Sequence, residues 1–185
     1  MARLTDDEID RYRADGWVVP AWRLPARRTD EMRDALDALL RDNPGVRPEK
    51  LVSAHIEGDN GEGVRGSRAF LDLARDPEIV ELVSGVLGED VILWGCHVFC
   101  KPAVEGYETP WHQDGHYWPI RPLATCTVWV ALEESKVENK SVWSGEAKTL
   151  EQGYKRGDSR RRVDKSAENV SCVRVEERFF TASPG

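Results

Sequence analysis

The sequence predicts an α+β domain in which helices come first and the strands of a sheet follow. Two observations support this order. Apolar residues recur at helical spacing as far as residue 87, and β-rich apolar runs occupy residues 91–100 and 125–132. At 185 residues the chain fits a single domain.

Each expected helix carries its own boundary signals. Thr5 and Glu8 have the spacing of a capping box, and Gly16 follows as a terminator. Pro77 stands at a first-turn position of the last helix. The stretch 58–66 holds four glycines and is expected to be a mobile loop. The expected helices span residues 5–16, 29–42, 67–73 and 76–87.

The strands are expected mainly in the second half of the chain. A short strand at 17–20 follows the first helix, and a continuous apolar strand is expected at 91–100. Within that strand we expect Trp94, Cys96 and Cys100 to be buried. Further strands are expected through residues 111–118, 125–132 and 170–180.

Composition excludes several classes of function. The net charge is −7, and the only dense basic run, 160–162, is flanked by acidic residues, so we expect no nucleic-acid partner. No apolar run is long enough for a membrane span, and the N-terminus lacks the apolar core of a signal peptide. The four cysteines form no Cys-x-x-Cys pair. We therefore expect a cytoplasmic protein with free thiols and no membrane partner.

The residues that indicate chemistry are His112 and Asp114. On a strand, residues two apart project from the same face, and their Cα atoms lie ~6–7 Å apart. An imidazole and a carboxylate so placed can hold one divalent ion. They would supply two ligands of the two-histidine, one-carboxylate site of non-haem iron oxygenases.

The surroundings of this pair carry a family resemblance. The segment from Trp111 through Gly115, followed by Tyr117, Trp118 and Arg121, resembles the phytanoyl-CoA dioxygenase family. The likeness extends over residues 4–139. It implies dependence on Fe(II) and 2-oxoglutarate, and hydroxylation of an unactivated C–H bond.

The resemblance also implies a fold: a mainly β, double-stranded β-helix (jelly-roll) core, complete or incomplete, with the N-terminal helices packed outside. Residues 1–139 would hold those helices and the first strands. Residues 140–185 would be a divergent, loop-rich segment of the same domain.

Residue roles follow from the resemblance. His112 and Asp114 would be the first two iron ligands, and Trp129 would line the 2-oxoglutarate pocket. Lys101 and Thr127 would also lie at the co-substrate site. The substrate, a small or lipid-like molecule, would be bordered by His116, Tyr117, Trp118 and Arg121.

The chain departs from the family pattern after residue 139. Family members carry a distal histidine and, beyond it, an arginine that pairs with 2-oxoglutarate, but no histidine follows His116 here. We therefore expect a C-terminally truncated or altered relative. His116 or His97 could replace the third ligand, and the alternative for His97 is a histidine of the core. His55 is expected in a surface loop.

Two other functions remain open on the sequence. The chain could be a non-catalytic jelly-roll remnant that acts as a binding or oligomerisation module, with self-association through an exposed sheet edge. It could also be a cupin-like metalloprotein that uses His97, His112 and Asp114 without 2-oxoglutarate.

Overall fold

The computed structural model of the chain describes residues 2–100, 124–133 and 171–174. Helices precede most of the sheet, as expected, and helix outweighs strand in this part of the chain. The mainly β core that the resemblance implies is therefore not seen within the described ranges. The helices are α1 (Asp6–Asp15), α2 (Ala26–Asp42), α3 (Arg68–Ala74) and α4 (Pro77–Leu87), with a 3-10 turn η1 (Pro48–Lys50). The strands are β1 (Trp17–Val18), β2 (Gly58–Asp59), β3 (Arg65–Gly66), β4 (Thr127–Val130) and β5 (Ser171–Arg174).

The predicted capping box of α1 is confirmed. The Glu8 N–H donates to Thr5 Oγ1 at 3.2 Å, and the Thr5 N–H donates to Glu8 Oε2 at 2.8 Å. The helix ends at Gly16, as expected. The second oxygen of the buried Glu8 carboxylate accepts a hydrogen bond from the Ala21 N–H at 2.7 Å. Glu8 therefore fixes both the start of α1 and the chain that leaves β1.

Helix α2 begins at Ala26, three residues before the predicted start at Thr29. Thr29, where the helix was expected to begin, lies buried in the first turn. The N–H groups of Arg28 and Thr29 instead donate to the Pro25 carbonyl at 2.8 and 3.1 Å. The N-cap residue is Pro25, whose side chain makes no capping hydrogen bond, so the usual N-cap signal is absent.

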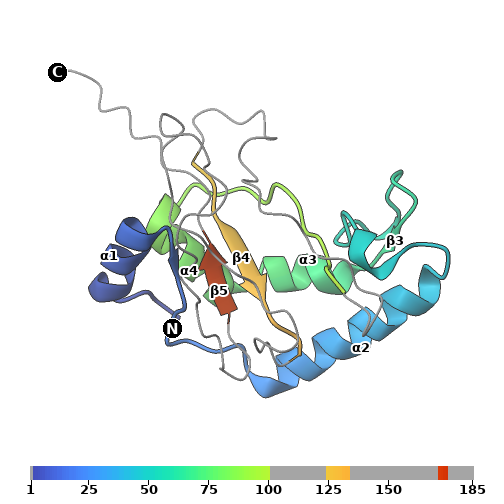
Figure 1. The fold of residues 1–185 in the computed structure, drawn as a ribbon, viewed down its shortest axis with the longest axis horizontal. Coiled ribbons are helices and arrows are strands. Elements are labelled where there is room, and N and C mark those ends of the chain that lie inside the picture. The colour runs from blue at the N-terminus through green and yellow to red at the C-terminus, as the bar shows by residue number, and fades with distance from the viewer. Residues whose placement is uncertain (1, 101–123, 134–170, 175–185) are drawn as a thin grey trace, which may run out of the picture.

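Asn43 connects the end of α2 to β3. Its Nδ2 donates to the carbonyls of Leu39 at 2.8 Å and Arg65 at 3.0 Å. Its Oδ1 accepts from the Arg65 N–H at 2.7 Å. The amide is buried and its hydrogen bonds reach both elements, so it holds the β2–β3 hairpin at the C-terminal end of α2 (Figure 1).

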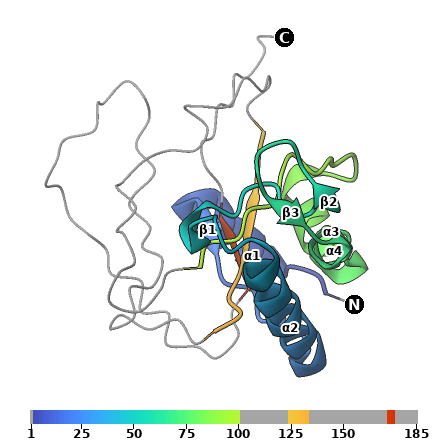
Figure 2. The same cartoon turned by 90° about the vertical axis from the view of Figure 1, so that its right-hand side faces the viewer.

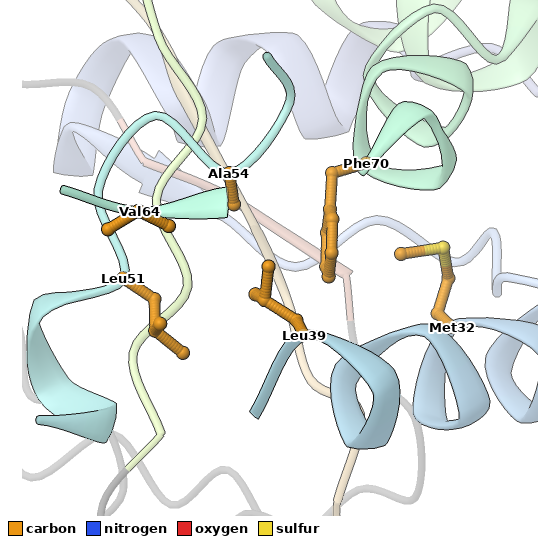
Figure 3. Close-up of a cluster of buried hydrophobic side chains, with 6 residues drawn as sticks. All are labelled: Met32, Leu39, Leu51, Ala54, Val64 and Phe70. Atoms are coloured by element: carbon orange, nitrogen blue, oxygen red, sulfur yellow. The ribbon is translucent and has the colours of Figure 1, made fainter. Parts of the chain in front are cut away.

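A buried cluster, which we term the α2–α3 core, fills the space between α2, α3 and the chain around residues 51–64. Figure 3 shows Phe70 of α3 pointing toward Leu39 of α2, with Met32 beside it. Met32, Ala35, Leu39 and Leu40 of α2 thus form an apolar stripe that faces inward. The core consists of Met32, Leu39, Leu51, Ala54, Val64 and Phe70.

The glycine-rich stretch is a hydrogen-bonded hairpin, so the expected mobile loop is wrong. Gly58 pairs with Gly66, and Asp59 pairs with Arg65. At the tip, Asn60 Oδ1 accepts a hydrogen bond from the Glu62 N–H at 2.8 Å. This is one of several hydrogen bonds between side chains and backbone that hold the turn beyond the two paired residues of each strand. A Cβ at Gly66 would lie 2.2 Å from the Ile56 carbonyl oxygen, so only glycine fits there.

A second buried cluster, the α1–α4 core, lies beneath a three-stranded antiparallel sheet. The strand order is β1-β5-β4, with Val18 and Val128 both in register with Val173. Figure 2 shows α3 and α4 on one side of β4. The expected strands at 17–20 and 125–132 are therefore confirmed in shorter form, and the described residues of the strand expected at 170–180 form β5. The core consists of Ala2, Leu4, Tyr12, Val18 and Leu82.

The strand expected at residues 91–100 is wrong. Within the described ranges this segment forms a single antiparallel bridge, between Val98 and Leu51. Cys96 and Val98 pack against the α2–α3 core, but Trp94 is 57% exposed and is not the core residue that we expected. A ladder needs a neighbouring strand along its whole length, and among the described residues only the short stretch 48–54 hydrogen-bonds to this segment.

Candidate functional site

Strand β4 has two faces of different character. Cys126 and Val128 pack against the α1–α4 core. Because neighbouring residues of a strand point to opposite faces, Thr127 and Trp129 project from the other face. Both side chains are partly buried. The two predicted co-substrate residues within the described ranges therefore lie together on the face turned away from the helices.

The same face continues upstream of β4. Thr125 precedes the strand by two residues and shares the alternation of Thr127 and Trp129, because the intervening Cys126 packs on the helical side. Its hydroxyl oxygen is buried and has no hydrogen-bond partner in the part of the chain that the structure describes. Thr125 was not among the predicted site residues. The signal was present, since polar residues at 125 and 127 alternate with apolar residues at 126, 128 and 130.

Strand β4 is held at its C-terminal end by Arg33 of α2. Arg33 Nε donates to the Leu132 carbonyl at 2.7 Å and lies 3.2 Å from Glu133 Oε1. Its Nη1 donates to Asp30 at 2.9 Å. Leu132 also packs against the α2–α3 core. The strand that carries Trp129 is thus fixed between the two cores, by Val128 at its centre and by Leu132 at its end.

Neighbouring strands give this face one further aromatic residue. Trp17 of β1 and Thr127 of β4 are both in register with Arg174 of β5, which lies between them. Val18 belongs to the α1–α4 core, so Trp17 projects from the opposite face, the one that carries Thr127. Trp17 was not among the predicted site residues, because a two-residue strand gives little periodicity to interpret.

Most of the predicted site lies outside the described residues. This applies to both expected iron ligands, His112 and Asp114, and to the co-substrate residue Lys101. It applies equally to the expected substrate residues His116, Tyr117, Trp118 and Arg121. In residues 2–100 and 124–133, no three histidine, cysteine, aspartate or glutamate side chains gather as a metal site would require. The roles of the expected iron ligands, of Lys101 and of the expected substrate residues stay predictions.

The two histidines that the structure describes are both near the hairpin side of the molecule. His97 is exposed, so its assignment to the core is wrong. Its Nδ1 accepts a hydrogen bond from the Ser53 N–H at 3.4 Å, which leaves Nε2 as the nitrogen open to a further partner. His55 lies in a turn, as expected, and is partly buried.

Cys96, Cys100 and Cys126 are shielded rather than reactive. Burial raises the pKa of Cys96 to about 11 and that of Cys126 to about 12. Cys100 is less enclosed, and burial with the nearby Glu49 and Asp37 raises its pKa as well. Thiols with raised pKa values stay protonated at neutral pH and make poor nucleophiles or metal ligands. All three therefore act as small apolar residues in the described structure.

Comparison with known proteins assigns the family. The family model for phytanoyl-CoA dioxygenase matches residues 12–144, a range that runs from α1 to beyond β4 and includes His112, Asp114 and Trp129. Searches of the curated proteins and of the solved structures gave no match. No helix within the described ranges is long and apolar enough to cross a membrane. The matched range covers well over half of the sequence, and the chain therefore belongs to the phytanoyl-CoA dioxygenase family, whose members are in general Fe(II)- and 2-oxoglutarate-dependent oxygenases with a jelly-roll fold.

Proposed function

We propose that this chain is an Fe(II)- and 2-oxoglutarate-dependent hydroxylase with a jelly-roll core that acts on a small or lipid-like substrate. The observation that carries the proposal is the two-sided character of β4. Its apolar face closes a core, and its other face presents Thr127 and Trp129 together. A co-substrate pocket needs such a face, because a packed core leaves no room for a ligand.

The proposed iron ligands suit a ferrous ion. His112 offers a neutral nitrogen and Asp114 a charged oxygen, and this donor set leaves positions free for other molecules. The protein's part is to hold these groups and to keep bulk water away. With iron and 2-oxoglutarate bound, O₂ would be the oxidant: one of its oxygen atoms would enter succinate as 2-oxoglutarate loses CO₂, and the other would enter the hydroxylated C–H bond.

The described face also suits 2-oxoglutarate. Trp129 gives a flat apolar wall for the carbon chain, and Thr127 gives a hydroxyl that can donate to a carboxylate. Lys101 would add a positive charge to offset the charge of the dianion. The substrate would lie beyond, bordered by His116, Tyr117, Trp118 and Arg121. Each of these roles rests on the family pattern.

The decisive experiment is anaerobic titration of the full chain with Fe(II) and 2-oxoglutarate. We expect the weak visible absorption band of a chelated co-substrate, and succinate once oxygen is admitted. His112→Ala and Asp114→Asn should abolish both signals. Asp72→Asn is the matched control, because Asp72 makes only an exposed ion pair with Arg68 on α3, and it should leave both unchanged. Absence of the band and of succinate in the unmodified chain would refute the proposal.

The third iron ligand is tested separately. His97 reaches a metal only through Nε2, since Nδ1 accepts from Ser53. Metal content of His97→Ala and His116→Ala, measured after anaerobic loading with Fe(II), separates the candidates. A loss confined to one variant identifies the ligand. The His97 result also tests the cupin-like alternative, because that alternative requires this residue.

A second function has one observation in its favour. Ile92 is 89% exposed, Trp94 57% and Phe99 67%, an unusual run of exposed apolar side chains. Such a run of exposed apolar side chains suits a non-catalytic module that self-associates. Sedimentation of the full chain over a range of concentrations tests this. Concentration-dependent association that Ile92→Ser weakens, together with no iron binding, would favour the module over the enzyme.

A further inference from the structure

The Thr125 hydroxyl is a buried polar group with an unmet hydrogen bond. Its Oγ1 is enclosed, and no group in the described ranges pairs with it. Native proteins pair nearly all such groups, because water solvates them in the unfolded chain and an empty apolar setting does not. An unpaired hydroxyl at this position is therefore a reason to look for a partner that arrives with a ligand.

The position of Thr125 indicates which ligand. Cys126 and Val128 point into the α1–α4 core, so Thr125, Thr127 and Trp129 form one row on the opposite face. Spacing along an extended chain puts successive members of that row ~6–7 Å apart. A five-carbon dicarboxylate is about as long as one such interval, so a molecule with one carboxylate at Thr127 can bring the other to Thr125, while the large indole of Trp129 borders it.

We propose that the Thr125 hydroxyl donates a hydrogen bond to a carboxylate of bound 2-oxoglutarate. The assignment rests on the proposed function. A carboxylate only accepts, and a threonine hydroxyl is free to rotate and donate, so the two groups are complementary. Hydrogen bonds to a charged acceptor are the stronger kind. Thr125 would thus be a binding residue additional to those that the family resemblance implies.

The test is Thr125→Val, which keeps the shape of the side chain and removes the hydroxyl. Calorimetric titration of the Fe(II)-loaded full chain with 2-oxoglutarate under anaerobic conditions should show roughly tenfold weaker binding. The melting temperature of the ligand-free chain should stay the same or rise, because a group without a protein partner has been removed. Thr125→Ser, which keeps the hydroxyl, should retain most of the affinity.

Thr5→Val is the matched control, since the same change there removes a hydroxyl with a known partner. Thr5 Oγ1 accepts from the Glu8 N–H, so this variant should melt earlier and bind 2-oxoglutarate as before. If Thr125→Val binds as tightly as the unmodified chain, or loses stability as Thr5→Val does, the assignment of Thr125 is overturned. If the unmodified chain binds no 2-oxoglutarate, the proposed function itself fails and this assignment fails with it.

Discussion

The two cores of the molecule are assembled over different distances along the chain. The α2–α3 core takes its buried residues from positions 32 to 70, where each element lies close to the next. The α1–α4 core joins residues 2–18 to Leu82 and then to Val128. The second core packs against β4 itself, through Val128, whereas the first reaches only Leu132, beyond the end of that strand. The candidate site therefore depends on long-range packing, whereas the hairpin side of the molecule is built from local contacts.

The largest expected effect is the loss of free energy of unfolding when one leucine in each core is truncated. Leu39→Ala tests the α2–α3 core, and Leu82→Ala tests the α1–α4 core. Each side chain is at most 2% exposed, so each truncation should cost about 2–5 kcal/mol in urea unfolding. Only Leu82→Ala should also weaken 2-oxoglutarate binding, because Leu82 packs beneath β4. Equal effects of both variants on that binding would remove the distinction between the cores.

The next largest effect is expected from Asn43→Ala, which tests how firmly the β2–β3 hairpin is held to α2. This change leaves the Arg65 N–H and two carbonyls without their partner, so we expect a loss of about 1–3 kcal/mol. Circular dichroism during denaturant unfolding measures it. Asp42→Ala changes the exposed neighbour and should alter stability little. A loss below ~0.5 kcal/mol would mean that Asn43 does not hold the hairpin to α2.

A smaller loss of stability is expected when Arg33, which joins α2 to the C-terminal end of β4, is replaced. Arg33→Met removes the donor to the Leu132 carbonyl, and we expect a loss of about 1 kcal/mol because the guanidinium is partly exposed. Amide exchange in β4 should become faster. Arg27→Met, on the same helix, breaks only an exposed ion pair with Glu31 and should leave that exchange unchanged. Identical exchange in the two variants would contradict the anchoring role.

The smallest effect is pH-dependent and concerns Glu8. Burial would raise the pKa of Glu8, but hydrogen bonds from Thr5 and Ala21 outweigh it and lower the pKa below 4.5. The charged form is thus favoured by folding, so its stabilisation is present above pH 4.5 and is lost as the pH falls through the lower, folded-state pKa. Glu8→Gln should lower stability by less than about 1 kcal/mol at neutral pH. Unfolding measured against pH should show that this difference shrinks below pH 4.5.

Features that depend on a few neighbouring residues were predictable from sequence. The capping box of α1 lies within four residues, and Pro77 begins α4 as expected. The start of α2 was misplaced because its N-cap residue is Pro25, which has no capping side chain and so gives no N-cap signal. Residues 91–100 had the composition of a buried strand, but burial depends on what lies alongside, and composition does not encode that.

In the candidate site, too, the features set by neighbouring residues were predictable and those set by distant residues were not. Thr127 and Trp129 were indicated by family resemblance, and the alternation along 125–130 explains why they share a face. The helical covering of the opposite face was not predictable, because it comes from α1 and α4, about 40 residues or more away in sequence. The same alternation places Thr125 on this face, and the burial of its hydroxyl is what distinguishes it as a candidate.

Gly66 has a consequence for how this sequence can drift. A library that samples all residues across positions 58–66 should accept Asn or Asp at Gly63, where φ is 83° and the space is open. At Gly66 every other amino acid would push its first side-chain carbon into two backbone carbonyls, those of Ile56 and Ala54. Gly63 and Gly66 therefore differ in the substitutions that they tolerate, although both are glycines of one hairpin. Gly66 should be the least replaceable residue of that hairpin.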